Sequence, residues 1–295
     1  MSSSTPETRP ATADDVDAVA DVANALEIAL IGHPLITAAD IRVWWTSADL
    51  ATASWLVERD GRLDAFAWVK FGDAWESFIA SRPGHRDFEP FLLDLAEQRV
   101  REAGGSQLRL DVLARDDFRR ELVSARGYEP VRYFYEMRME LNGPLPEPEW
   151  PEGIRAAAFR PEDARAFFDA VGEAFADEWG FHSMPFDEWK RVRVDESDTS
   201  LYFVAWDGPE IAGFARCEER GDDASVGMLG VRRPWRRRGI GEALLRHAFG
   251  EFHGRGKRAA ALGVDSANPS GATRLYERVG MHVAGEDVVY EKDLA

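Results

Sequence analysis

The segment from Arg232 to Gly241 combines the residue types of an anion-binding site. It reads RRPWRRRGIG and places five arginines in seven positions, followed by Gly-x-Gly. Guanidinium groups bind phosphate, and glycines let a backbone turn tightly and approach a ligand closely. If a helix starts at these glycines, its unpaired N–H groups and its partial positive charge add to the attraction. The segment therefore predicts a site for a phosphorylated ligand.

A strand and a helix are predicted on either side of this segment, and they would hold it in place. Residues 225–231, SVGMLGV, form an apolar run that ends at Val231. Apolar residues then recur every four positions from Ile240 to Phe252, so a helix is expected to begin near Gly239 or Gly241.

Two common phosphate-binding loops do not fit this turn. A Walker-type loop needs Lys-Ser/Thr after its last glycine, where this chain has Glu242 and Ala243. A dinucleotide fingerprint needs a third glycine, and only Gly239 and Gly241 are present. The ligand is therefore expected to be a different phosphorylated cofactor.

Composition limits the classes of protein that this chain can belong to. It has 295 residues and a net charge of −17, with 45% apolar and 11% aromatic residues, which is typical of a globular protein. The acidic balance argues against nucleic acid and favours cationic small molecules. No run of eighteen apolar residues predicts a membrane span, and the polar first residues predict no secretion signal. A single cysteine, Cys217, fits the reducing cytoplasm, and a buried position in a strand is expected for it.

The sequence repeats one pattern at about half its length. Three landmarks recur in the same order: a hairpin aspartate, a proline before a long helix and a glycine after the next helix. The pairs lie 147, 151 and 153 residues apart, and they are Asp60 and Asp207, Pro83 and Pro234, and Gly127 and Gly280. A nearly constant offset over three landmarks indicates a duplicated domain.

Each half has the same expected order of elements. Short helices are followed by a strand meander, a long helix, a strand, a further helix and a closing strand, at residues 133–141 and 288–294. Residues 142–153, with four prolines and two glycines, are expected to join the halves. The prediction is an α/β (α+β) protein with domains at residues 1–145 and 152–295.

The pattern Arg236-x-x-Gly239-x-Gly241 resembles motif A of the GNAT acetyltransferases, at the start of their central helix. Residues 229–231, LGV, resemble the family's pantetheine-binding strand, and residues 262–281 resemble its motif B. The resemblance covers residues 154–294 and reaches the first half through the repeat. It implies two tandem GNAT-like domains, each with a mixed, mainly antiparallel central sheet flanked by helices.

The resemblance also implies acetyl-CoA, or another short acyl-CoA, as cosubstrate, and no metal. Backbone groups at the end of the strand would hold pantetheine, and the loop and helix start would wrap the pyrophosphate. Motif B would contact the cofactor near the splay between strands. The implied cofactor-binding residues are Leu229, Gly230, Val231, Arg236, Arg237, Arg238, Gly239, Ile240, Gly241, Asn268, Ser270, Gly271 and Thr273.

Tyr276 stands where the family's general acid protonates the departing thiolate, which makes it the implied catalytic residue. The alternative for Tyr276 is a tyrosine of the hydrophobic core, and the alternative for Asn268 is a turn or helix cap. Arg232 and Arg233 are expected to lie at the protein surface or to contact the 3′-phosphate of the CoA cosubstrate.

The first copy has different residues at the equivalent positions. The offset at Pro83 and the offset at Gly127 align Arg236 with His85, Arg238 with Asp87, Gly239 with Phe88, Gly241 with Pro90, Asn268 with Arg115 and Tyr276 with Val123. Bulky or acidic side chains there would exclude and repel a pyrophosphate. The N-terminal domain is therefore expected to lack a cofactor site and to have a structural or substrate-shaping role.

An acceptor amine must lose protons, so a base is wanted on the acceptor side. Many GNAT relatives carry a glutamate where this chain has Ser225. Other candidate substrate-binding residues are Asp177, Glu178, Trp179 and Glu218, because carboxylates beside aromatic rings suit a cationic amine.

The predicted function is acetyl transfer to a primary amine of a small molecule by direct attack in a ternary complex. Two alternatives stay open: a mycothiol-synthase-type acetyltransferase of a thiol metabolite, and a non-catalytic acyl-CoA-binding or scaffold protein. The expected state is a cytoplasmic monomer or homodimer.

Overall fold

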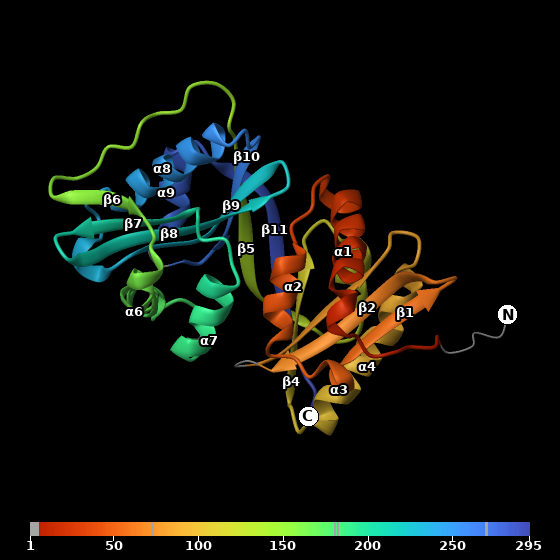
Figure 1. Ribbon diagram of the computed structural model, residues 1–295. Helices are drawn as coiled ribbons and strands as arrows, with labels where there is room; N and C mark the ends of the chain where they lie inside the picture. Colours follow the sequence, from red (N-terminus) through yellow and green to blue (C-terminus); the bar gives the residue numbers. More distant parts are fainter. Residues whose placement is uncertain (1–5, 72–73, 180, 182, 269–270) are drawn as a thin grey trace. The chain divides into compact units, whose positions relative to one another are not determined.

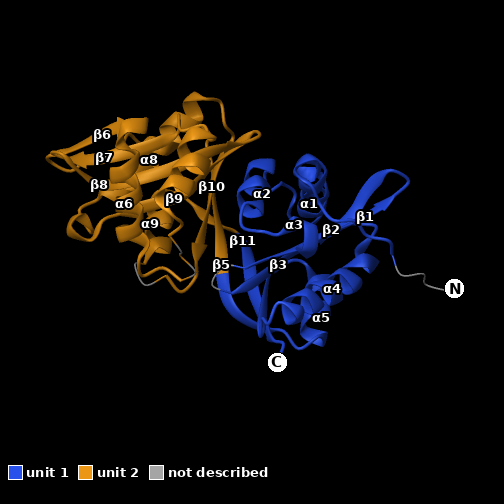
Figure 2. Cartoon of the chain, turned by 60° about the horizontal axis from the view of Figure 1, so that its bottom comes forward, with its two compact units in different colours: residues 1–133, 285–295 blue, residues 134–284 orange. Residues whose placement is uncertain are grey.

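The computed structural model describes residues 6–71, 74–179, 181, 183–268 and 271–295. The chain forms two compact units: unit 1 holds residues 1–133 and 285–295, and unit 2 holds residues 134–284 (Figure 2). No helix among the described residues is both long and apolar enough to cross a membrane.

Unit 1 contains a five-stranded sheet in the order β1-β2-β3-β4-β11. Neighbouring strands run antiparallel except β3 and β4, which are parallel. The strands are β1 (Ser54–Arg59), β2 (Arg62–Phe71), β3 (Trp75–Ser81), β4 (Gln107–Leu113) and β11 (His282–Asp293). The helices are α1 (Val16–Ile31), α2 (Ala38–Trp45), α3 (Leu50–Ala53), α4 (Glu89–Glu102) and α5 (Asp117–Ala125).

Unit 2 contains a six-stranded sheet in the order β5-β10-β9-β8-β7-β6, in which only β9 and β10 are parallel. The strands are β5 (Glu129–Glu140), β6 (Ile154–Ala158), β7 (Tyr202–Asp207), β8 (Glu210–Arg220), β9 (Asp223–Val231) and β10 (Ala259–Asp265). The helices are α6 (Ala164–Phe175), α7 (Phe186–Lys190), a π-helical turn (Arg191–Asp195), α8 (Ile240–Gly254) and α9 (Ala272–Arg278). Short 3₁₀ turns precede several helices, at Ala13–Asp15, Arg86–Phe88, Pro161–Asp163 and Arg233–Trp235.

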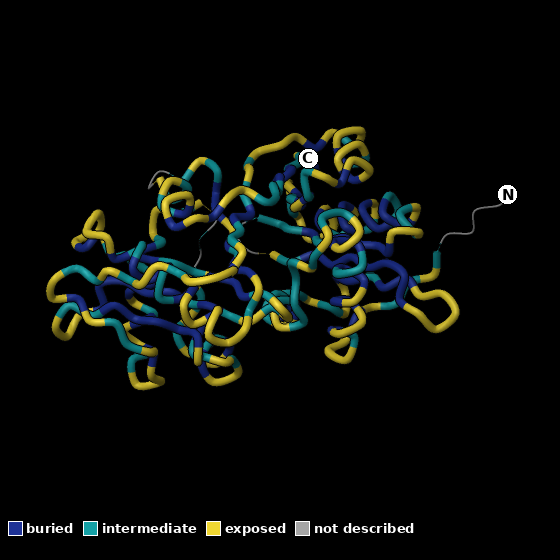
Figure 3. Tube along the Cα trace, turned by 90° about the horizontal axis from the view of Figure 1, so that it is seen from above, coloured by how far each residue is buried: buried dark blue, intermediate teal, exposed yellow. Residues whose placement is uncertain are grey.

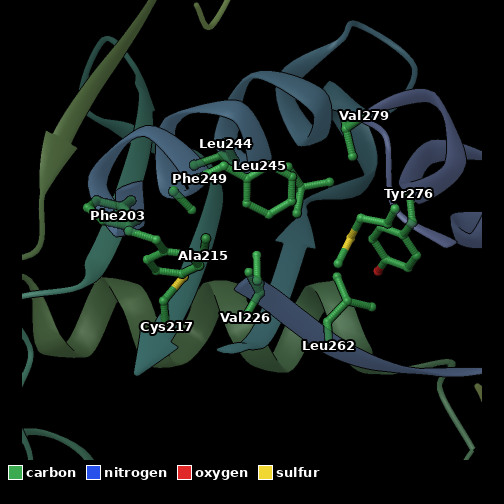
Figure 4. Close-up of a cluster of buried hydrophobic side chains, with 14 of the residues drawn as sticks. Phe203, Ala215, Cys217, Val226, Leu244, Leu245, Phe249, Leu262, Tyr276 and Val279 are labelled. Carbon is green, nitrogen blue, oxygen red and sulfur yellow. The ribbon is translucent and has the colours of Figure 1, made fainter. Parts of the chain in front are cut away.

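The helices of unit 2 cover both faces of its sheet (Figure 1). On one face, α8 packs Leu244, Leu245 and Phe249 against strand residues such as Ala215 and Val226 (Figure 4). On the other face, side chains of α6 and α7 pack against β7 and β8. The strands β7 and β8 are accordingly buried over most of their length, and buried segments are dark blue in Figure 3.

Cys217 lies in this core as expected, because its side chain is only 1% exposed. Burial raises the pKa of its thiol, so the cysteine is an uncharged packing residue at neutral pH.

The predicted duplication is confirmed in the backbone. Both Asp-Gly hairpins are present, between β1 and β2 and between β7 and β8. In each hairpin the strand pairing shifts register a few residues before the turn, in β1 and in β7. The long helices begin at Glu89 and Ile240, the same 151-residue offset as the prolines. Gly127 and Gly280 both adopt positive φ after the following helix, at 81° and 99°. The mixed, mainly antiparallel sheets flanked by helices also agree with the expected fold class.

The two compact units are not the two contiguous halves of the sequence. Both closing strands form where expected, but β5 pairs through residues 134–140 with β10, and β11 pairs through residues 287–293 with β4. The closing strand of each sequence half therefore completes the sheet of the other unit. The expected boundary between residues 145 and 152 marks where the sequence copies meet, whereas the contacts divide the chain at residues 133/134 and 284/285. This exchange is possible because the edge strands β4 and β10 offer backbone N–H and C=O groups that either closing strand can pair with.

Candidate active site

A cleft opens in unit 2 where the parallel strands β9 and β10 separate. Their pairing covers Ala224 with Ala260 and Ser225 with Ala261, at the start of both strands. Beyond this point, residues 226–231 and 262–265 form opposite walls of a cavity of about 810 Å³. The start of α8, helix α9 and the loop after α6 complete the lining. Backbone polar groups on the separated strands are thus available to a ligand.

A β-bulge at Gly227 lies at the inner end of this cleft. Arg216 pairs with Met228 and Cys217 with Val226, so Gly227 is an extra residue in β9. A Cβ atom at Gly227 would lie 3.0 Å from Nη2 of Arg216, which leaves little room for a side chain. The sequence analysis missed this bulge, although an isolated glycine within a strand pattern is its usual signal.

The turn between β9 and α8 forms the anion-binding end of the cleft. Helix α8 begins at Ile240, as predicted, and Gly239 before it has φ of +89°. Arg237 is also left-handed, with φ of +62°. The backbone N–H groups from Arg237 to Glu242 donate to no other described residue. These donors and the positive end of the helix dipole together suit a phosphate group.

The glycines of this turn serve different purposes. At Gly239 a Cβ atom would meet only Cγ of Pro151, at 4.0 Å, so the left-handed backbone is what requires glycine. At Gly241 a Cβ atom would lie 3.2 Å from Leu275, and at Gly230 it would lie 2.3 Å from the ring of Phe214. Gly230 and Gly241 therefore permit close packing of elements within unit 2.

Two arginines of the segment form ion pairs with the end of α6 and the loop after it. Nε of Arg232 lies 2.6 Å from Glu173, and its guanidinium stacks over the ring of Trp235. Arg233 pairs with Asp177. Both pairs are partly exposed, in agreement with the expectation that these arginines belong to the surface.

Two further arginines stabilise the turn itself. Arg236 donates to the backbone oxygens of Val231 and Ala174, both at 3.1 Å. Arg238 lies 3.5 Å from Asp207 and is not part of the cleft lining. The side chains of Arg236 and Arg238 are therefore occupied by protein groups.

Arg236 and Arg237 both line the cleft, but only the side chain of Arg237 has neither a hydrogen bond nor an ion pair to a described residue. Arg274 and Arg278 of α9 line the same cavity, and Arg278 lies 3.7 Å from Glu242. The sequence analysis did not select the two α9 arginines, although their i,i+4 spacing places them on one helix face.

Tyr276 projects from α9 into the cavity and is 7% exposed. Its ring lies beside Leu262 at the edge of the hydrophobic cluster in Figure 4. The hydroxyl makes no hydrogen bond to a described residue, and burial, together with the charge of Glu178, raises the pKa of Tyr276 to about 12. Tyr276 is therefore both a core residue and a protonated donor that faces the cleft.

Asn268 and Glu178 come from different loops and meet in the cleft. Nδ2 of Asn268 donates to both carboxylate oxygens of Glu178, at 3.0 and 3.2 Å. Asn268 lies in the loop after β10, and Glu178 lies in the loop after α6. The sequence analysis named both residues but gave no indication that they form a pair.

Aromatic side chains surround Glu178. Trp179 is 39% exposed, and its ring lies 6.1 Å from the ring of Phe134 on β5. The rings of Phe175 and Phe181 are tilted relative to each other, with centroids 5.5 Å apart, and both residues line the cavity. Phe134 was not selected from the sequence, because its place in unit 2 depends on the strand exchange.

The other expected site residues divide into two groups. Leu229, Gly230, Val231, Ile240 and Gly271 line the cavity, and their contact with a cofactor stays a prediction. Asp177, Glu218 and Thr273 do not line it: Asp177 pairs with Arg233, and Glu218 lies 2.6 Å from Arg220. Ser270 lies outside the described residues.

Comparison with known proteins agrees with this geometry. Residues 162–281 match the acetyltransferase (GNAT) family. A mycothiol acetyltransferase of Thermobispora bispora is 30% identical over 250 residues, which are 81% of this chain and 84% of that protein. A mycothiol acetyltransferase of Geodermatophilus obscurus is 30% identical over 267 residues, with 82% and 81% coverage.

Solved structures match both halves together. A GCN5-related N-acetyltransferase from Sphaerobacter thermophilus has a TM-score of 0.78 and 30% identity, over 98% of this chain and 95% of that one. A tandem GNAT protein from the clavulanic acid biosynthesis pathway has a TM-score of 0.75 at 18% identity, over 99% of each chain. With two copies of one fold and a split-strand cleft in the second unit, this chain belongs to the GNAT family of N-acetyltransferases and has the tandem architecture.

Proposed function

We propose that unit 2 transfers an acetyl group from acetyl-CoA to a primary amine on a small molecule. One observation carries the proposal: the cleft joins the gap between β9 and β10 to a helix start whose N–H groups have no described acceptor. A long ligand with a polar arm and a pyrophosphate matches this combination.

The described residues fit acetyl-CoA along the length of the cleft. Backbone groups of Leu229, Gly230 and Val231 would bind the amides of pantetheine. The N–H groups from Arg237 to Glu242 would bind the pyrophosphate, with the guanidinium of Arg237 beside them. Arg274 and Arg278 add positive charge at the same end of the cavity, which suits the remaining phosphate.

Acetyl-CoA supplies a thioester carbonyl that an amine can attack. Tyr276 would donate its proton to the departing sulfur, since a pKa of about 12 keeps its hydroxyl protonated at neutral pH. The aromatic rings and the carboxylate of Glu178 would receive a cationic acceptor amine. We propose direct transfer in a ternary complex, in line with the absence of a cysteine among the described lining residues.

We also propose that the first sequence copy, residues 1–145, binds no CoA and has a structural or substrate-shaping role. The curated relatives are named mycothiol acetyltransferases, so the des-acetyl precursor of mycothiol is the first acceptor to test. Ser225 lies where β9 and β10 still pair, outside the cleft lining. Because residue 225 is a serine, this chain has no carboxylate at the strand position where many GNAT relatives carry a glutamate.

The test has two stages. Calorimetric titration with acetyl-CoA should give one site per chain. Release of free thiol from acetyl-CoA should then depend on an added amine, across a panel that includes the mycothiol precursor. Binding without release for any amine would favour an acyl-CoA-binding protein, and absence of binding would overturn the proposal.

A further inference from the structure

We propose that Glu178, held by Asn268, binds the acceptor ammonium group and accepts a proton from it. This inference rests on the proposed function and names a base for it. It also assigns Asn268 to positioning of the carboxylate, in place of the cofactor contact that the family resemblance implies.

The cavity offers few candidates for this base. Among the described lining residues there is no histidine, and the carboxylates are Glu178, Glu242 and Asp265. Glu242 lies in the first turn of α8, 2.8 Å from Arg246 and 3.7 Å from Arg278, at the end of the cleft proposed for phosphates. These cations lower the pKa of Glu242 and stabilise its charge.

Asp265 has a structural task at the end of β10. Its Oδ1 accepts a hydrogen bond of 2.9 Å from the backbone N–H of Ala267, which shapes the turn that leads to Asn268. The side chain is 7% exposed. Asp265 is therefore committed to the turn.

Glu178 differs from both. It forms no ion pair with a described Arg or Lys side chain, and its recorded partner is the neutral amide of Asn268. Two contacts from one Nδ2 atom fix the carboxylate but leave its negative charge uncompensated. A carboxylate has about four lone-pair sites, so sites remain free for an ammonium group.

The surroundings of Glu178 suit a cation next to the reacting atoms. The neighbouring ring of Trp179, with Phe134 6.1 Å from it, offers aromatic faces that attract an ammonium group. Tyr276 faces the same cavity, and the charge of Glu178 contributes to its raised pKa, so the two groups are electrostatically coupled. The other charged groups that line the cavity are Glu242, Asp265 and the arginines already described.

The proton transfers balance. The ammonium nitrogen loses two protons and forms the bond to the acetyl carbon, while the thioester C–S bond breaks. Glu178 accepts one proton and releases it to solvent. Tyr276 donates its proton to the sulfur and regains the second ammonium proton. The products are the acetamide, free CoA thiol and one proton in solution.

The variant Glu178→Gln tests the base directly, because it keeps the shape and removes the charge. We expect kcat/KM for the amine to fall by about 10²- to 10⁴-fold at neutral pH. The residual rate should rise with pH up to the pKa of the free amine, because the variant can use only amine molecules that are already deprotonated in solution. Calorimetric affinity for acetyl-CoA should stay as in the wild type.

Glu251→Gln is the matched control, since it makes the same change at an exposed position of α8 outside the cleft lining. Its rate and pH profile should equal those of the wild type. Asn268→Ala tests positioning: we expect about a tenfold fall in kcat/KM for the amine, without a change in acetyl-CoA affinity. A loss of acetyl-CoA affinity in Asn268→Ala would return Asn268 to the cofactor and overturn its positioning role.

The outcomes separate this inference from the proposed function. An active wild type together with a Glu178→Gln variant of unchanged rate and pH profile would overturn the base and leave the acetyltransferase intact. Weaker acetyl-CoA binding by Glu178→Gln would place Glu178 on the cofactor side and also overturn it. A wild type that binds no acetyl-CoA would remove both proposals.

Discussion

The turn before the long helix is built differently in the two units, although each turn follows an equivalent strand. In unit 2 the chain enters α8 through left-handed Gly239, and the first N–H groups of the helix face the cleft. In unit 1 the chain enters α4 through Phe88, whose φ of −77° is right-handed. The first helical residue there is Glu89, and its side chain is fully buried.

Glu89 is surrounded by donors. Arg119 donates to both of its carboxylate oxygens at 3.0 Å, and Ser81 donates at 2.6 Å. Nε of Arg86 lies 2.6 Å from Glu89, and the same guanidinium also pairs with Asp116. Unit 1 therefore holds an anion of its own at the helix start, where unit 2 offers donors to a ligand.

The difference teaches how one fold can keep or lose an anion site. In both units the helix start favours negative charge. In unit 1 a carboxylate that is covalently part of the chain satisfies this preference, and the result is a buried ion-pair network. In unit 2 the glycine at this position brings no carboxylate, so the N–H groups at the helix start stay available to an anionic ligand. The following predictions test that contrast.

The largest effect is expected for Glu89→Ala in unit 1. The substitution removes a fully buried carboxylate from buried Arg119 and half-buried Arg86 and leaves Asp116 as their shared ion-pair partner, so the free energy of unfolding should fall by about 3–5 kcal/mol. Urea unfolding measures it. The control Glu102→Ala, at the exposed end of the same helix, should change the free energy by less than about 0.5 kcal/mol. A loss for Glu89→Ala within 1 kcal/mol of that control would mean that the network does not stabilise unit 1.

Acid should weaken the same network. Burial acts to raise the pKa of Glu89, but Arg119 and Arg86 outweigh it, and the net shift is downward. The contribution of Glu89 to stability is thus fully present above the ordinary glutamate pKa of about 4.3 and is lost as the pH falls through the lower, folded value. The free energy of unfolding of the wild type should therefore fall more steeply in this acid range than that of Glu89→Gln. Parallel pH curves for the two proteins would contradict the assignment.

Tyr276→Phe should lower kcat about 100-fold or more and leave acetyl-CoA affinity unchanged, because only the proton donor is lost. Steady-state kinetics and calorimetry measure the two quantities. Tyr128→Phe is a suitable control, since it removes a buried tyrosine hydroxyl from unit 1, where the hydroxyl lies 3.2 Å from Glu97. Full turnover by Tyr276→Phe would exclude Tyr276 as the acid.

Gly239→Glu would place a carboxylate in the turn of unit 2, one residue before Ile240, which corresponds to Glu89 of unit 1. The left-handed backbone costs about 1 kcal/mol for a side chain, and repulsion of the pyrophosphate adds about 1 kcal/mol. Acetyl-CoA affinity should fall roughly 30-fold in calorimetry. Gly250→Glu, at an exposed position of the same helix with no atom near its Cβ, should bind normally. Equal affinities for both variants would show that the turn is not the anion site.

The smallest effect separates the arginines. Arg237→Ala should weaken acetyl-CoA binding about fivefold, since an exposed charge contact is worth about 1 kcal/mol. Arg238→Ala should change affinity less than about twofold, because Arg238 lies near Asp207 and outside the cleft. The reverse order would mean that the loop rearranges when the ligand binds.

Local patterns in the sequence determined most of the architecture. The Asp-Gly turns, the strand that ends at Val231 and the helix start after Gly239 all depend on short-range backbone preferences. The constant offset between copies then extended each prediction to the other half. The cleft and the place of Tyr276 in it were implied only by the resemblance to the GNAT motifs, and not by local backbone preferences.

Only the tertiary structure decided the side-chain partners and the exchange of closing strands. A backbone ladder at the edge of β4 or β10 accepts either closing strand, so local sequence cannot say which one is used. The same holds for the arginines: Arg236 and Arg237 are adjacent and identical in type, yet one binds carbonyl oxygens and the other faces the cleft. The pairing of Glu178 with Asn268, 90 residues apart, likewise depends on which surfaces the fold brings together. Sequence by itself determined the frame and its anion-binding turn, and the long-range contacts of the folded chain determined which side chains are free to do chemistry there.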